Sequence, residues 1–171
     1  MKAHATKPDA EPAYCLSLRI RHPSIDPTEL SRAFALEPLH AFRAGDLRAA
    51  RQGSGSTRHA ASYWLVDLVP GLATAIAFES APSDAIGVSQ TARQRLGDMA
   101  AGNPGLALSL IVTQVLKAQA VLLTRLVAEG GDVTLLVELS TQTLQGFSLA
   151  PQTLRALADL AVTVNVEFAE V

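Results

Sequence analysis

Hydrophobic and polar residues alternate with a period of two in three segments of the chain, residues 14–21, 133–139 and 162–168. A fourth segment, residues 63–69, is aromatic and β-branched and ends before Pro70. Period-two alternation is typical of a strand that buries one face. The sequence therefore predicts four strands that share a core.

A proline-containing phrase occurs twice, as "HPSIDPTELSRAF" from His22 and as "FSLAPQTLRALADL" from Phe147, each time between predicted strands. Proline suits the first position of a helix, where no amide donor is needed. The first copy also has Asp26 as a helix cap and Glu29 as the second member of a capping box. The phrases predict two short helices that begin at Pro27 and Pro151.

Residues 105–129 have a helical pattern with Asn103 as its cap and a narrow polar stripe. The helix should be covered on several sides or lie in a subunit interface, and it could break near Lys117. Residues 99–116 carry no charge, which raises the question of a membrane span. Because residues 103–105 (Asn-Pro-Gly) interrupt this run, a buried helix is the favoured interpretation.

The two strand–helix–strand units predict an α+β fold, a ferredoxin-like sheet with both helices on one face. A long helical linker would join the units where that fold has a tight hairpin. Residues 1–12 are interpreted as a disordered leader and residues 13–171 as a single α+β domain. Residues 72–104, rich in Ala, Ser and Gly, are interpreted as an insertion or connection.

The composition places few limits on function. Of the 171 residues, 49% are hydrophobic and only 18% are charged, which fits a folded domain that buries a face in a partner. The net charge of −2 argues against nucleic acid and membrane as partners. Cys15 is the only cysteine, so an internal disulfide is excluded. The first residues contain no apolar run, so we expect a cytoplasmic protein.

A basic connection, residues 39–60, contains the best candidates for binding a small anion, because guanidinium groups suit phosphate and carboxylate. Within it, Gly45 permits a left-handed turn that Asp46 could cap. The candidate ligand-binding residues are Arg43, Asp46, Arg48, Arg58, His59 and Trp64. For the turn residues 43–46, a structural role is the favoured interpretation and ligand binding is the alternative.

No pattern predicts a catalytic residue, a metal site or a cofactor. The four histidines have no metal-ligand spacing, and "GSGSTR" at residues 53–58 lacks the ending of a phosphate-binding loop. Tyr14 and Phe168 fall on the predicted covered face of the sheet, and Arg19 and Arg21 on its open face. The open face therefore has basic residues but lacks a stacking platform for bases. Tyr63 and Trp64 have opposite phases, and one of them should lie on the open face.

The order of "LSLRIRHPSIDPTELSRAFALEP", Arg43-x-Gly45-Asp46, Trp64 on a strand and "FSLAPQTLRALADLAVTVNVEF" resembles the bacterial family called "domain of unknown function 4279". The resemblance runs from about Tyr14 to Phe168 and implies an α+β domain with a strand–helix–strand unit at each end. It implies no reaction. Some small families of this kind sit beside toxins as immunity proteins.

These features predict a non-enzymatic binding or interaction domain. A homodimer is one arrangement, formed through the open sheet face or through the helix of residues 105–129. A second hypothesis is a sensor or enzyme that binds a small anionic ligand with residues 43–59. A third is an immunity-type protein that neutralises a partner toxin.

Overall fold

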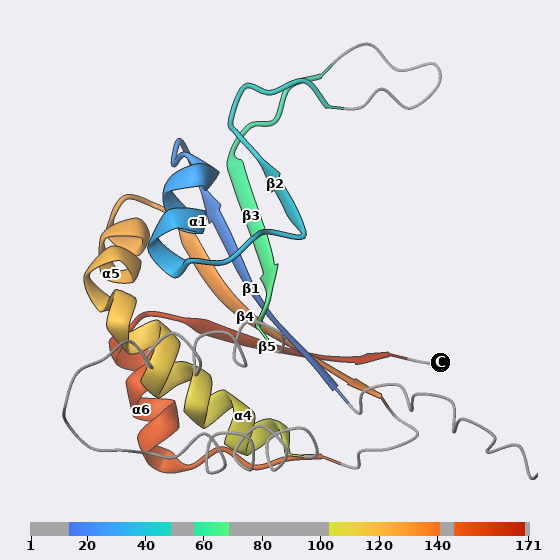
Figure 1. The fold of residues 1–171 in the computed structure, drawn as a ribbon, viewed down its shortest axis with the longest axis vertical. Helices are drawn as coiled ribbons and strands as arrows, with labels where there is room; N and C mark the ends of the chain where they lie inside the picture. The colour runs from blue at the N-terminus through green and yellow to red at the C-terminus, as the bar shows by residue number, and fades with distance from the viewer. Residues whose placement is uncertain (1–13, 49–56, 69–102, 141–145, 170–171) are drawn as a thin grey trace, which may run out of the picture.

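The structure is a computed structural model that describes residues 14–48, 57–68, 103–140 and 146–169. All four segments contribute strands to one five-stranded sheet (Figure 1). The predicted leader, residues 1–12, lies outside the described residues. So does the predicted insertion, residues 72–104, apart from its last two residues.

The sheet has the order β2-β3-β1-β4-β5. Its strands are β1 (Tyr14–His22), β2 (His40–Phe42), β3 (Ser62–Asp67), β4 (Asp132–Ser140) and β5 (Thr163–Ala169). The central strand β1 is antiparallel to both β3 and β4, and β4 is parallel to β5. The α+β class is confirmed, but this order is not that of a four-stranded ferredoxin-like sheet.

The differences are the edge strand β2, which the sequence pattern did not reveal, and β5, which lies at the other edge, parallel to β4. Residues 39–60 were interpreted as a flexible connection, yet three of them form an edge strand antiparallel to β3. A three-residue strand is too short to show alternation. The chain continues from β2 into a turn at Arg43–Asp46, and Leu47 then bridges to Arg58.

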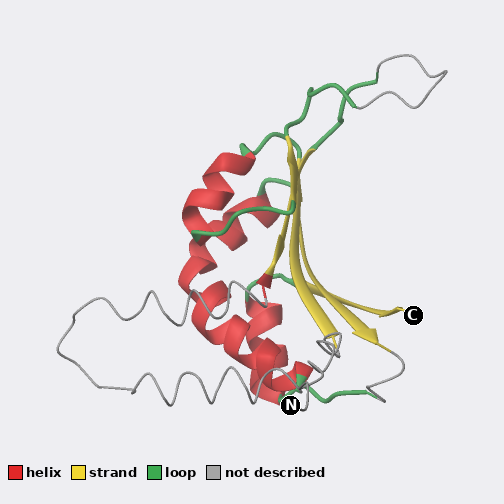
Figure 2. Ribbon diagram, turned by 45° about the vertical axis from the view of Figure 1, so that its right-hand side comes forward, coloured by secondary structure: helices red, strands yellow, loops and turns green. Residues whose placement is uncertain are grey.

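The described helices lie on one face of the sheet (Figure 2). They are α1 (Pro27–Phe34), α4 (Pro104–Ile111), α5 (Ala120–Ala128) and α6 (Pro151–Asp159). Both phrase prolines, Pro27 and Pro151, stand at the beginning of a helix, as predicted. The strands that flank these helices belong to the same sheet, so the described helices cover one face and leave the other open.

The first turn of α1 is capped as predicted. The backbone N–H of Thr28 donates to Asp26 Oδ1 at 2.9 Å, which satisfies one of the free amides at the helix start. The Glu29 side chain, expected to complete a capping box, instead accepts a hydrogen bond from Arg125 on α5 at 2.6 Å. Glu29 therefore connects two helices rather than closing its own.

The long apolar helix changes form in its middle. Between α4 and α5 the chain forms a π-helical segment, η1 (Val112–Leu116), and a 3₁₀ segment, η2 (Lys117–Gln119). The predicted break near Lys117 is thus confirmed. Among the described residues, this is the one helical stretch long and apolar enough to cross a membrane, a property that core helices share. Here it packs on the sheet and buries Leu108, Leu116 and Leu123 completely.

Gly105 allows the start of α4 to lie against the loop that precedes α6. A Cβ atom at this position would come within 2.2 Å of the Ser148 carbonyl oxygen. Such an approach is impossible without backbone movement, so only glycine fits. This contact joins the long helix to the second strand–helix–strand unit.

The buried face of α6 differs from the prediction. The pattern predicted Leu154, Leu157, Ala158 and Ala161 as its apolar side, whereas Leu154 is 51% exposed. The buried stripe is instead Thr153, Ala156, Leu157 and Leu160. The helix tolerates buried Thr153 because its hydroxyl forms a 2.8 Å hydrogen bond with Ser109 of α4.

The alternation of the strands defines the core. Leu16, Leu18 and Ile20 of β1 are fully buried under the helices, as predicted. On β5 the prediction was wrong for Phe168, which is 64% exposed although it lies on the same face as buried Leu139. The reason is visible in Figure 2, where the end of β5 extends away from the helices.

Candidate functional site

The open face of the sheet carries the outward residues of all five strands. Register places them in rows across the strands, because directly paired residues point to the same face. The row nearest the start of β4 is Phe42, Tyr63, Arg21 and Asp132. The next row is His40, Leu65, Arg19, Thr134 and Thr163.

Three rings stack at one end of this face, and we call Phe42, His59 and Tyr63 the stacked trio. The centroids of Phe42 and Tyr63 lie 5.1 Å apart with their planes at 8°. The centroids of Phe42 and His59 lie 3.6 Å apart with their planes at 22°. Register places Phe42 on the β2 side of Tyr63 and Arg21 on its β1 side.

Arg21 stands on β1 directly opposite Tyr63. Its side chain is exposed, and no hydrogen bond or ion pair joins that side chain to another described residue. The guanidinium of nearby Arg19 already has partners. It donates to Thr134 Oγ1 at 3.3 Å and lies 3.9 Å from Asp132 Oδ2. Arg19 Nε is nevertheless buried without a described hydrogen-bond partner. The trio therefore adjoins two guanidinium groups with unused donors.

The far end of the open face is acidic. Cys15 lies there opposite Glu138, which in turn pairs with Glu167 of β5. Burial raises the pKa of the Cys15 thiol, and the charges of Asp67 and Glu138 raise it further. A raised pKa makes the thiol a poor nucleophile at neutral pH. The open face is thus polarised, with aromatic and basic groups at one end and carboxylates at the other.

Five of the six predicted anion-binding residues lie on one hairpin, residues 43–48 and 57–59, in which the His59 backbone bonds to Gly45 and Asp46. Two of their side chains are already used within the fold. The Arg43 guanidinium pairs with Asp26 at the start of α1 and also reaches Thr28. The Asp46 carboxylate accepts the Arg43 backbone N–H at 2.7 Å and so caps the turn, with Gly45 at a φ of 88°. The structure gives both side chains a role within the fold.

Of the remaining candidates, Trp64 alone lies away from this hairpin. Arg58 Nη1 donates to the Gly45 carbonyl at 2.6 Å, while Arg48 is exposed and pairs through its backbone with Thr57. His59 belongs to the stacked trio. Trp64 lies on the helix-covered face, fully buried, with its ring stacked on Phe34. An anion site formed by all six residues stays a prediction.

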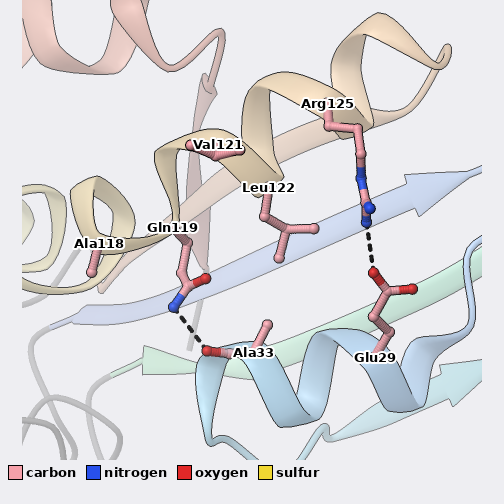
Figure 3. Close-up of a pocket in the computed structure, with 7 residues that line it drawn as sticks. All are labelled: Glu29, Ala33, Ala118, Gln119, Val121, Leu122 and Arg125. Atoms are coloured by element: carbon pink, nitrogen blue, oxygen red, sulfur yellow. Dashed lines mark hydrogen bonds and ion pairs between the residues drawn. The ribbon is translucent and has the colours of Figure 1, made fainter.

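A groove of about 360 Å³ lies on the helical side, between α1 and the η2–α5 segment (Figure 3). Arg125 and Glu29 close one part of it with their hydrogen bond, and Gln119 Nε2 donates to the Ala33 carbonyl at 2.8 Å in another. Leu122 points into the space between the helices, whereas Val121 points away from α1. The groove's lining residues are Glu29, Ala33, Ala118, Gln119, Val121, Leu122 and Arg125.

The groove and the open face differ in how their polar groups are used. In the groove, Glu29, Gln119 and Arg125 already bond across the space, and the hydrogen bond to Glu29 raises the pKa of Arg125. A polar ligand would have to replace those bonds. On the open face, Arg21 has no described partner beside an available ring face. The open face is therefore the stronger candidate site.

Sequence reasoning found only part of this site. His59 is among the predicted candidates, and Arg21 is predicted on the open face. The prediction that this face lacks a stacking platform is wrong, because Phe42 and Tyr63 stack there. The phase difference between Tyr63 and Trp64 was the available signal, because it required one aromatic side chain on each face. The stack itself depends on the β2–β3 pairing, which the pattern did not predict.

Comparisons with known proteins return no match. No protein-family model matches the chain, no curated protein matches it, and no solved structure matches it. Within the described residues, no group of three or more His, Cys, Asp or Glu side chains is placed to hold a metal ion.

Proposed function

We propose that this chain is a binding domain that holds a small, planar, negatively charged ligand on the open face of its sheet. The single observation that carries the proposal is the stacked trio beside Arg21. A planar ring packs against the free face of Tyr63, and its carboxylate or phosphate pairs with Arg21. Both contacts use groups that the described fold leaves available.

The energetics favour such a ligand over a purely apolar one. Stacking against an aromatic ring contributes about 0.5–1.5 kcal/mol beyond the area buried. A guanidinium–carboxylate or guanidinium–phosphate pair adds a charge-assisted bond, which is roughly twice as strong as a neutral one. Arg19 lies one row away on the same strand, and its positive charge adds to the attraction for the anionic group.

The acidic end of the open face disfavours ligands that carry a second negative group. Glu138 and Glu167 repel a second negative group placed far from the arginines. An elongated polyanion laid along the strands would meet these carboxylates. This charge arrangement favours a compact ligand with one anionic end, and it disfavours a nucleic acid strand.

The proposal is tested by thermal shift and calorimetric titration with a panel of aromatic carboxylates and nucleoside monophosphates. A ligand present at 100 times its dissociation constant stabilises the folded state by about 2.7 kcal/mol. We expect Tyr63→Leu and Arg21→Ala to abolish the shift. Arg155→Ala, at an exposed position on α6, is the matched control and should leave the shift unchanged.

Two results would overturn the proposal. One is the absence of any shift across the panel at millimolar concentration. The other is a thermal shift that remains in both Tyr63→Leu and Arg21→Ala, because the ligand would then bind at a different site. Tight, strongly salt-dependent binding of oligothymidine would instead identify a single-stranded nucleic acid as the ligand.

A further inference from the structure

The strand β5 forms one edge of the sheet. Among the described residues it pairs with β4 on one side only. An edge strand exposes backbone N–H and C=O groups that another strand can pair with. Its second side is therefore a template for strand addition.

The two edges of the sheet differ in how they limit pairing. The opposite edge, β2, has only three residues, and a very short strand is one way to prevent association. In contrast, β5 has seven residues, Thr163–Ala169, without Lys, Arg or Pro. Its one charge is Glu167. The β5 edge lacks the features that normally keep an edge strand unpaired.

Apolar side chains are exposed beside this edge. Six large hydrophobic side chains are exposed in the described part of the chain, and three of them belong to α6 and β5. Leu154 is 51% exposed, Val166 is 39% exposed and Phe168 is 64% exposed. Val166 and Phe168 share the helix-covered face with the core residues of β4. Beside the β5 edge, apolar side chains of the core-facing side of the sheet are therefore exposed to solvent.

We propose that two copies of this chain pair through β5, antiparallel, around a twofold axis at Val166. The two five-stranded sheets then form one continuous sheet with all described helices on the same side. Val164 lies opposite Phe168 of the partner subunit, a β-branched–aromatic pair of the kind that stabilises sheets. Asn165 lies opposite Glu167 of the partner subunit.

The side chains disfavour two neighbouring registers. A one-residue shift would place the apolar face of one copy beside the polar face of the other. Centring the axis on Glu167 would set two carboxylates directly opposite each other, which is destabilising. The axis at Val166 pairs an amide with a carboxylate instead. Within one chain, Asn165 Nδ2 already donates to Glu167 Oε1 at 2.7 Å, so the two groups share a face.

Light scattering across a concentration series tests the proposal, which is independent of the ligand site. We expect wild type to reach twice the chain mass as concentration rises. Val166→Glu and Phe168→Glu should each weaken the dimer about tenfold or more, since Val166→Glu places two carboxylates across the axis. Val121→Glu is the matched control, because Val121 is 87% exposed on α5. That variant should dimerise as wild type does.

Hydrogen exchange provides a second readout that does not depend on variants. Backbone amides on the outer side of β5 should become protected as concentration rises, while those of β2 should not. A monomer at all concentrations up to millimolar overturns the proposal, as does a dimer unaffected by both β5 variants. Protection of β5 that is independent of concentration also overturns it, since the chain's own residues would then cover the edge.

Discussion

The hydrogen bond between Trp64 and Ser31 should be a measurable part of the stability. Trp64 is fully buried between the sheet and α1, and its Nε1–H donates to Ser31 Oγ at 3.0 Å. Ser31→Ala removes the acceptor and leaves the indole N–H without a partner. A buried donor left unsatisfied costs about 1–3 kcal/mol. Because Ser31 is only half-buried and water can approach, we expect a loss of about 1–2 kcal/mol.

A double-mutant cycle isolates this bond. Trp64→Phe removes the donor, so Ser31→Ala should cost less in that background, with a coupling energy of about 0.5–1.5 kcal/mol. The assay is urea unfolding followed by far-ultraviolet circular dichroism on the four proteins. Ser24→Ala, at an exposed position, is the control and should change stability by no more than about 0.5 kcal/mol.

The same residue offers an optical check, because Trp64 is the only tryptophan of the chain. Native emission should be that of a buried indole, and acrylamide should quench it only after unfolding. Truncation by Trp64→Ala should cost about 3–5 kcal/mol. A coupling energy near zero, or strong quenching in the native protein, would refute the placement of Trp64 under α1.

Three further predictions concern other parts of the fold. Gly105→Ala should destabilise the protein by about 1–3 kcal/mol in urea unfolding, because its Cβ would meet the Ser148 carbonyl, and an unchanged midpoint would contradict that contact. The pKa of Asp26 is lowered by the hydrogen bond from the Thr28 backbone N–H, with a smaller contribution from Arg43. A lowered folded-state pKa adds stability that is present above the unfolded value near 3.9 and is lost as pH falls through the folded value. Between about pH 5 and pH 2, Asp26→Asn should therefore lose less stability than wild type, and equal losses would argue against the cap. The Cys15 thiol, whose pKa is raised by burial and then by Asp67 and Glu138, should react slowly with a disulfide reagent at pH 8. Glu138→Gln should accelerate that reaction, and an identical rate in both proteins would contradict the charge effect.

Much of the architecture could be predicted from local patterns. Alternation identified β1, β4 and β5, because each strand has one buried face and needs apolar residues at every second position. The prolines at 27 and 151 located two helix starts, because proline fits the first helical turn. These signals depend on neighbours in sequence, which is why they could be read from the chain alone.

The errors arose where distant partners decide the outcome. The buried face of α6 includes Thr153, whose hydroxyl is satisfied by Ser109 from another helix. Phe168 is exposed because the end of β5 extends past the helices. Likewise, the aromatic stack requires β2 to pair with β3. A strand of three residues is too short for its sequence to predict that pairing. Hydrophobic periodicity contains no information about these tertiary contacts.

The central position of β1 has a consequence for synthesis on the ribosome. Arg19 and Thr134 are neighbours in the sheet although they lie 115 residues apart in sequence. While a nascent chain still lacks β4, one whole side of β1 has no partner, and contacts of such long range form slowly. During translation the growing polypeptide therefore exposes an unpaired apolar strand edge, which is prone to aggregation. We expect a chaperone to be most useful at this stage.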